Sequence, residues 1–176
     1  MIKVIVWLQF TYVQIMTWLI GHLLESASQV DKKIRDELKG LPDSFVFSMG
    51  SLPAGPLFVM QKLADGSLYC LRKNDTAKAD LIISFKHVKL AFLVFAFQES
   101  TARSFANERV LLDGEINLGM IIVRCLDRME SLVLPKFIAK RALKRYPSIS
   151  LHEKLGLAIK IYLHLVMGLF RRSRNV

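Results

Sequence analysis

Residues 109 to 137 read RVLLDGEINLGMIIVRCLDRMESLVLPKF, and this stretch decides the fold class. Its first part is apolar and is closed by Gly114, which predicts a β-strand over Glu108 to Asp113. From Glu115 apolar residues recur at helical spacing as far as Leu134, where Pro135 interrupts the pattern. The stretch therefore predicts a strand followed directly by a long helix.

Four more strand-like runs precede this stretch, and turn signals separate the first three of them. Asp65-Gly66 stands between two apolar runs, which is a strong hairpin signal. We expect these four runs to form an antiparallel meander to which the strand at 108–113 is added. The predicted strands cover residues 45–51, 57–63, 67–73 and 79–85.

Helical patterns occupy the remainder of the chain, which gives an α+β layout. Ser150 is a predicted N-cap for the last helix, with Glu153 at the capping-box position. Besides the N-terminus and the helix after Glu115, helices are predicted over 29–39, 87–97, 99–107, 136–145 and 151–170.

The N-terminus carries no charged side chain from Val4 to Leu24, a length that could cross a bilayer. On a helical projection, however, most polar residues of this segment gather on one side. This pattern favours an amphipathic helix that covers a core or lies in a membrane interface. A membrane span or anchor is the alternative, and a signal peptide fits less well because Lys3 is its only basic residue.

The residues from Ala79 to Phe137 resemble the sterol carrier protein type 2 family. The match consists of the strand ADLIISF, a helical segment rich in Phe, and the run from Arg109 to Phe137 with its Leu-Gly step. It looks most like the bacterial branch that includes lipid-binding accessory factors of ubiquinone biosynthesis. Those relatives usually have Asp after the glycine, where this chain has Glu115.

The resemblance implies a five-stranded, mostly antiparallel sheet covered by helices on one face, with an apolar ligand tunnel. It implies a lipid, acyl-chain, sterol or isoprenoid ligand and no fixed catalytic residues. Bulky and adaptable apolar side chains could line such a tunnel, although they could also simply pack against one another. The candidate ligand-binding residues are Phe85, Phe92, Phe95, Phe105, Leu111, Ile116, Met120, Val123 and Met129.

The net charge of +10 is concentrated at the C-terminus. Residues 1–130 hold 15 Lys and Arg against 14 Asp and Glu, whereas residues 131–176 hold 10 against Glu153 alone. Basic residues beside apolar helices suit anionic phospholipids. Nucleic acid is disfavoured because stacking aromatics are not interleaved with the basic helix, and a solvated basic face beside a dimer interface is an alternative. The predicted membrane contacts are Lys136, Lys140, Arg141, Lys144, Arg145, Arg171, Arg172 and Arg174.

Catalytic and metal-binding patterns do not emerge from the sequence. The four histidines lack metal-ligand spacing, and no serine lies in a G-x-S-x-G motif. Gly114 to Gly119 has the spacing of a phosphate-binding loop, but Met120 replaces the required Lys. Cys70 and Cys125 form no CxxC pair, which favours a reducing compartment. We expect no enzyme activity, cofactor or metal.

Three parts are predicted along the chain: an amphipathic helical segment over 1–40, a sterol-carrier-like domain over 41–135, and basic and apolar helices over 136–176. The expected function is to carry or present a hydrophobic ligand at the inner face of the cytoplasmic membrane. The alternative is a scaffold that forms a homo-oligomer or binds a partner enzyme through its apolar end helices.

Overall fold

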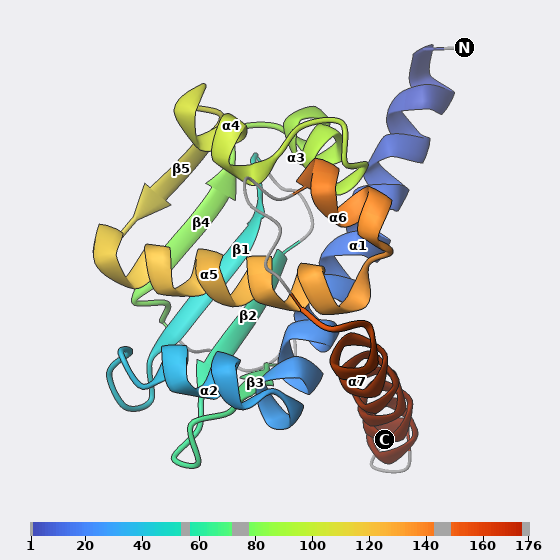
Figure 1. Ribbon diagram of the computed structural model, residues 1–176. Coiled ribbons are helices and arrows are strands. Elements are labelled where there is room, and N and C mark those ends of the chain that lie inside the picture. The colour runs from blue at the N-terminus through green and yellow to red at the C-terminus, as the bar shows by residue number, and fades with distance from the viewer. Residues whose placement is uncertain (1, 54–56, 72–77, 143–148, 174–176) are drawn as a thin grey trace.

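The computed structural model describes residues 2–53, 57–71, 78–142 and 149–173 and forms an α+β fold around a five-stranded sheet (Figure 1). The predicted fold class is thereby confirmed. The strands are β1 (Val46–Ser51), β2 (Leu57–Lys62), β3 (Leu68–Cys70), β4 (Leu81–Phe85) and β5 (Val110–Asp113). The helices are α1 (Ile2–Val30), α2 (Lys32–Leu38), α3 (Val88–Phe95), α4 (Thr101–Ala106), α5 (Ile116–Val133), α6 (Lys136–Ala142) and α7 (Leu151–Ser173).

The strands lie in the order β3-β2-β1-β4-β5. β4 pairs with β1 in parallel, while the other three pairings are antiparallel. The predicted four-stranded meander is therefore wrong at its last step, because β4 lies beside β1 and not beside β3. β1 is buried along its whole length, as expected for a central strand.

Helices α1 and α5 cover the same face of the sheet. The strand registers place Phe58, Met49, Ile83 and Leu112 in one row across β2, β1, β4 and β5. Gly21 of α1 approaches Phe58, and Gly119 of α5 approaches Leu112 at the two ends of this row. The opposite face of the sheet carries exposed apolar side chains, which are Leu57, Ile82 and Leu111.

Small residues let α1 approach the sheet closely. A Cβ atom at Gly21 would lie 3.2 Å from Cγ of Phe58, so a larger residue would push the helix away. Part of the polar stripe predicted for this helix is buried, because Thr17 and Ser28 face inward. Their hydroxyls are satisfied there: Thr17 donates to the carbonyl of Val13, and Ser28 accepts from the backbone N–H of Leu68. The stripe therefore includes a packing surface.

The predicted turn and cap signals are confirmed at two places. Gly66 has φ +81° in the β2–β3 turn, and the Asp65 carboxylate accepts from the Ser67 backbone N–H. Ser150 accepts from the backbone N–H of Glu153 at the start of α7, as expected for an N-cap.

Two arginines of α5 connect that helix to α2. Nε of Arg128 lies 2.8 Å from the carboxylate of Asp31, and both side chains are largely buried. Nε of Arg124 lies 2.9 Å from the carboxylate of Glu37, but this pair is about half exposed. Glu153 of α7 lies 3.7 Å from Arg128, so a single ion network connects α2, α5 and α7.

One hydrophobic core draws on all three predicted parts of the chain. It includes Leu24 from α1, Phe47 from β1 and Ile161 from α7, each almost completely buried. The division at residues 40 and 135 remains a prediction about domain organisation. Within the described residues, no helix has the length and apolar character required to cross a membrane.

Candidate functional site

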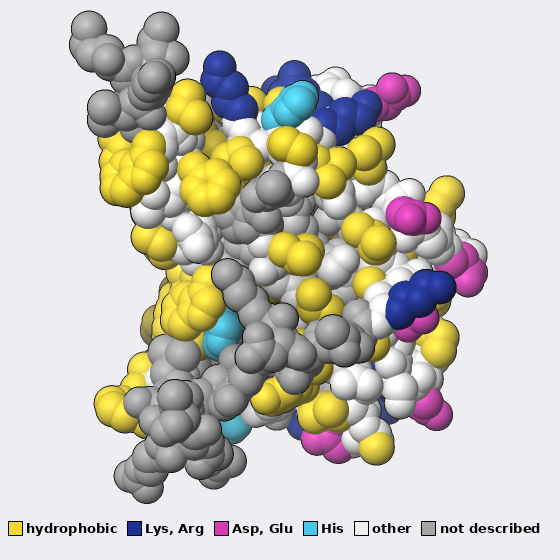
Figure 2. All heavy atoms as spheres, turned by 180° about the vertical axis from the view of Figure 1, so that it is seen from behind, with side chains coloured by type: hydrophobic (Ala, Val, Ile, Leu, Met, Phe, Trp, Pro, Cys, Tyr) yellow, Lys and Arg dark blue, Asp and Glu magenta, His cyan; other side chains and the backbone are white. Residues whose placement is uncertain are grey.

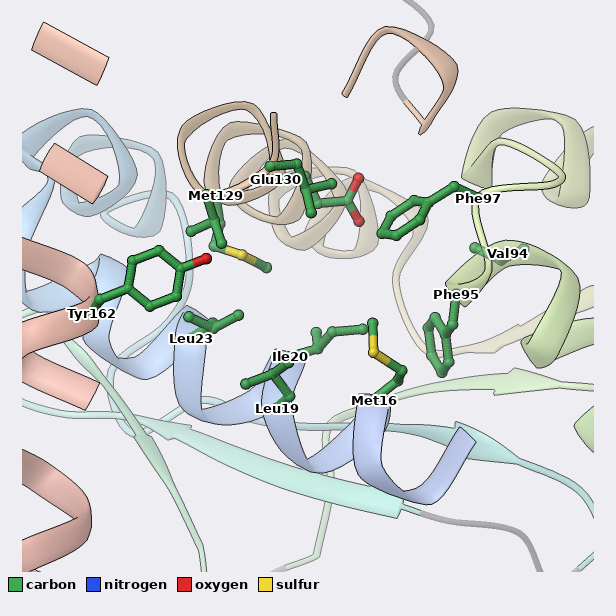
Figure 3. Close-up of a pocket in the computed structure, with 12 residues that line it drawn as sticks. Met16, Leu19, Ile20, Leu23, Val94, Phe95, Phe97, Met129, Glu130 and Tyr162 are labelled. Carbon is green, nitrogen blue, oxygen red and sulfur yellow. The ribbon is translucent and has the colours of Figure 1, made fainter. Parts of the chain in front are cut away.

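An apolar cavity lies between helices α1, α3, α5 and α7 (Figure 3). Its volume is about 120 Å³, and the cavity is partly open to solvent. Helix α1 contributes four residues of one helical face to one wall, and α7 contributes Tyr162. The lining is formed by Met16, Leu19, Ile20, Leu23, Val94, Phe95, Phe97, Met129, Glu130, Val133, Leu134 and Tyr162.

The size of the cavity bounds what it can hold. Ligand pockets for drug-sized molecules typically enclose about 300–1,000 Å³, while a dry cavity of about 150 Å³ can hold benzene. A cavity of about 120 Å³ is therefore large enough for a ring or a short piece of alkyl chain. A longer molecule must extend through the mouth or displace the adaptable side chains of Met16 and Met129.

Phe97 is held in the cavity wall by an unusual backbone conformation. It follows α3 with φ +56°, a left-handed position that normally favours glycine after a helix. A bulky residue in this region costs about 1–2 kcal/mol. In Figure 3 the ring of Phe97 is directed toward the cavity, beside the carboxyl group of Glu130.

Glu130 and Tyr162 bring polar atoms to this apolar cavity. Burial, together with the nearby charge of Asp127, raises the pKa of Glu130 to about 7. Burial also raises the pKa of Tyr162 above its ordinary value. The Tyr162 hydroxyl points into the cavity from α7, across from Phe95 and Phe97 (Figure 3). The site can thus combine apolar contact with a few hydrogen bonds.

The predicted ligand-binding residues fall in different environments. Phe95 and Met129 line the cavity. Phe85 is buried in the core and meets Phe95 edge to face, with ring centroids 5.5 Å apart. Phe92 and Phe105 are partly buried against the core.

The remaining predicted residues do not reach the cavity. Ile116 and Met120 are 71% and 49% exposed on the first turns of α5, and Val123 is partly buried. Leu111 lies on the face of the sheet opposite the helices. The structure therefore brings Phe95 and Met129 together but places Leu111, Ile116 and Met120 elsewhere, and the assignment of all nine stays a prediction.

Sequence reasoning missed the α1 wall as well as Glu130 and Tyr162. The sequence spacing already placed Glu130 on the apolar side of α5, because this residue stands four residues after Leu126 and four before Leu134. A charged residue at such a position is a candidate for a buried functional group. The contribution of α1 carried no such local signal.

Large apolar side chains are exposed on both terminal helices. On α1 they are Val6, Trp7, Leu8, Phe10, Ile15 and Trp18, and on α7 they are Leu151, Leu155, Ile159, Tyr162, Leu163, Val166, Met167 and Phe170. Figure 2 shows apolar side chains gathered at the upper left, over the N-terminal part of α1. Apolar surfaces of this extent are typical of contacts with a membrane or another protein.

The predicted basic contacts are only partly described. Lys136 is exposed at the start of α6. For four of the predicted contacts the structure describes the helix but not the side chain: Lys140 and Arg141 in α6, and Arg171 and Arg172 in α7. The other three, Lys144, Arg145 and Arg174, lie outside the described residues. The membrane contact of these residues stays a prediction.

The described part of the chain offers no site for a metal ion or for a reactive thiol. Its residues contain no group of three or more His, Cys, Asp or Glu placed to hold a metal ion. Cys70 and Cys125 are buried and not joined in a disulfide, and burial raises the pKa of Cys125 to about 12. At this pKa the Cys125 thiol remains protonated at neutral pH and is a poor nucleophile.

No protein-family model and no curated protein matches the chain. Solved structures do match it. The sterol carrier protein domain 2 of Helicoverpa armigera covers 65% of this chain and 87% of its own, with 13% identity and a TM-score of 0.46. A UbiJ-SCP2 ubiquinone synthesis protein covers 67% and 95%, with 12% identity and a TM-score of 0.44.

Sterol carrier protein 2 from Yarrowia lipolytica covers 73% of this chain and 93% of its own, with 12% identity and a TM-score of 0.38. These three solved structures carry sterol carrier protein 2 or its abbreviation in their names. These are the neighbours that the resemblance in residues 79–137 predicts. At these identities and TM-scores the likeness carries no functional argument, so the function has to be argued from the cavity.

Proposed function

We propose that this protein binds a hydrophobic ligand, without catalysis, in the cavity between α1, α3, α5 and α7. The observation that carries the proposal is the cavity itself, whose lining is apolar apart from Glu130 and Tyr162. Burial of each CH₂ group of a ligand contributes about 0.8 kcal/mol, so desolvation alone can hold an alkyl or isoprenoid chain. Lipids, acyl chains, sterols and isoprenoid quinone precursors are the ligand classes proposed.

Native mass spectrometry before and after organic extraction tests this proposal. We expect lipid to copurify with the wild-type protein and to be lost in Val133→Trp, which fills the cavity from α5 with a larger side chain. Ile116→Trp is the matched control, because it adds the same side chain at an exposed position of the same helix. Absence of lipid from wild type, or equal lipid in both variants, would contradict ligand binding in this cavity.

The ligand carrier is further proposed to work at the inner face of the cytoplasmic membrane. The exposed apolar side chains of α1 and α7 support this part of the proposal. An amphipathic helix can bury such a face at the lipid boundary, and each nearby Lys or Arg adds about 1 kcal/mol on anionic lipid. The basic C-terminal quarter of the chain has the composition for this attraction.

Cosedimentation with vesicles tests the membrane contact. We expect stronger binding to vesicles containing phosphatidylglycerol than to phosphatidylcholine alone, and a loss of at least tenfold in the double variant Leu163→Ser/Phe170→Ser on α7. Leu57→Ser/Leu111→Ser is the matched control, because these exposed side chains lie on the open face of the sheet. Equal effects of the two double variants would reject α7 as the docking surface.

The same exposed side of α7 also supports a second function, a scaffold that self-associates or binds a partner enzyme. Light scattering coupled to size-exclusion chromatography separates the two functions. A stable oligomer that ignores vesicles, and that the α7 double variant converts to a monomer, favours the scaffold.

A further inference from the structure

The carboxyl group of Glu130 is an unpaired acid in an otherwise apolar lining. Its side chain is partly buried, its oxygens are not completely shielded from solvent, and no hydrogen bond or ion pair joins it to another described residue. Two other buried or partly buried acids of this protein have partners: Asp31 pairs with Arg128, and Glu99 pairs with Arg109. Removing a polar group from water without a hydrogen bond costs about 1–3 kcal/mol, so such groups are normally paired.

The surroundings of Glu130 allow a polar group of a ligand to become the hydrogen-bond partner of its carboxyl group. In Figure 3 its carboxyl oxygens project from α5 toward the space between Met16 and Phe97. The hydroxyl of Tyr162 reaches the same cavity from α7. A carboxylate accepts hydrogen bonds, while a phenol can both donate and accept one.

Resting on the function proposed above, we propose that this cavity selects hydrophobic ligands whose polar end is an uncharged hydroxyl, which donates a hydrogen bond to Glu130. Tyr162 supplies a second polar contact at the cavity wall. Long-chain alcohols, isoprenols, sterols and phenols belong to this ligand class. Ligands that end in a carboxylate are disfavoured at this site.

Electrostatics distinguish the three common kinds of lipid head group. A carboxylate beside ionised Glu130 places two like charges in an apolar environment. An ammonium group would gain a counter-ion, but its burial costs several kcal/mol and it needs three acceptors. A hydroxyl needs only one acceptor and one donor and loses much less on leaving water. The cavity offers this smaller set of partners.

Displacement of the neutral fluorophore Nile red by three C12 ligands tests the selection. The ligands are 1-dodecanol, dodecanoate and dodecylamine, at pH 8.5, where Glu130 with its pKa of about 7 is mainly ionised. We expect dodecanol to displace the dye at a concentration at least about tenfold below that of dodecanoate. Because dodecanoate also loses more hydration, the decisive quantity is how this ratio changes in Glu130→Gln.

Glu130→Gln removes the charge but keeps an oxygen that accepts a hydrogen bond. We expect this variant to strengthen dodecanoate binding about tenfold while dodecanol binding changes less than threefold. Tyr162→Phe should weaken dodecanol binding by a few fold. Glu115→Gln, which removes a charge at the other end of α5, should leave all three ligands unchanged.

Two outcomes would overturn the selection while leaving ligand binding intact: an unchanged dodecanol-to-dodecanoate ratio in Glu130→Gln, or tighter binding of dodecylamine than of dodecanol to the wild type. If none of the three ligands displaces the dye, or if Val133→Trp binds them as the wild type does, the cavity is not a ligand site and the proposed function fails with it. Circular dichroism of each variant checks that the fold is kept.

Discussion

The two ends of helix α5 carry similar apolar side chains but meet different surroundings. Near its start, Ile116 and Met120 are largely exposed, whereas near its end Met129 and Leu132 are almost completely buried. The start of the helix meets the sheet, as the approach of Gly119 to Leu112 shows. The end also faces the cavity that α1 and α7 help to enclose (Figure 3). The terminal helices thus decide which apolar residues of α5 are enclosed.

Truncation of one side chain at each end of α5 gives the largest expected difference. Leu132→Ala should lower the free energy of unfolding by about 3 kcal/mol, because it removes buried carbons and leaves a cavity. Ile116→Ala should change it by less than about 0.5 kcal/mol, since that side chain is 71% exposed. Urea unfolding measures both, and equal losses would show that the start of α5 is covered in solution.

The ion pairs from α5 to α2 give the next comparison. Arg128→Met should cost about 2–3 kcal/mol, because it leaves the carboxylate of Asp31 buried without its partner. Arg124→Met should cost less than about 1 kcal/mol, since the pair with Glu37 is half exposed. Urea unfolding at low and high salt tests this ranking. A loss for Arg124→Met as large as that for Arg128→Met would contradict the assigned difference in burial.

Glu130 should give an effect that depends on pH. Its pKa rises from an ordinary value of 4.5 to about 7 in the folded protein, so the folded chain keeps the proton longer than the unfolded chain. Stability should therefore fall as the pH rises from 4.5 through 7, by up to about 3 kcal/mol for a pKa shift of this size. Glu130→Gln should remove this fall, while Glu115→Gln should retain the wild-type profile. A wild-type profile with no fall in this window would show that Glu130 is solvated.

Local sequence patterns were sufficient for the strands and helices but not for how β4 is paired. The runs at 45–51 and 79–85 predicted strands, and the Asp65-Gly66 signal predicted the hairpin correctly. The alternation of residues in the run at 79–85 does not indicate whether this strand pairs with β3 or with β1. The pairing depends on which strand is buried on both faces and so lies in the centre of the sheet. β1, which is buried along its whole length, is that strand.

The cavity was harder to predict than the fold because its walls come from distant parts of the chain. Phe95 and Met129 were predicted within the family resemblance, whereas Met16 and Tyr162 lie outside it. Their positions depend on the packing of α1 against the sheet and of α7 against α1 and α5. Helical periodicity indicates that these residues share an apolar face, but it cannot indicate which surface that face will meet.

The lengths of the strands also constrain how this protein can aggregate. The two edge strands, β3 with three residues and β5 with four, are the shortest in the sheet. An edge strand can act as a template for a strand of another molecule, and short edges are one way in which proteins suppress this addition. Sheet extension into fibrils is therefore disfavoured at both edges. Self-association in a crowded solution should instead proceed through the exposed helices, where it stays reversible and competes directly with vesicle binding.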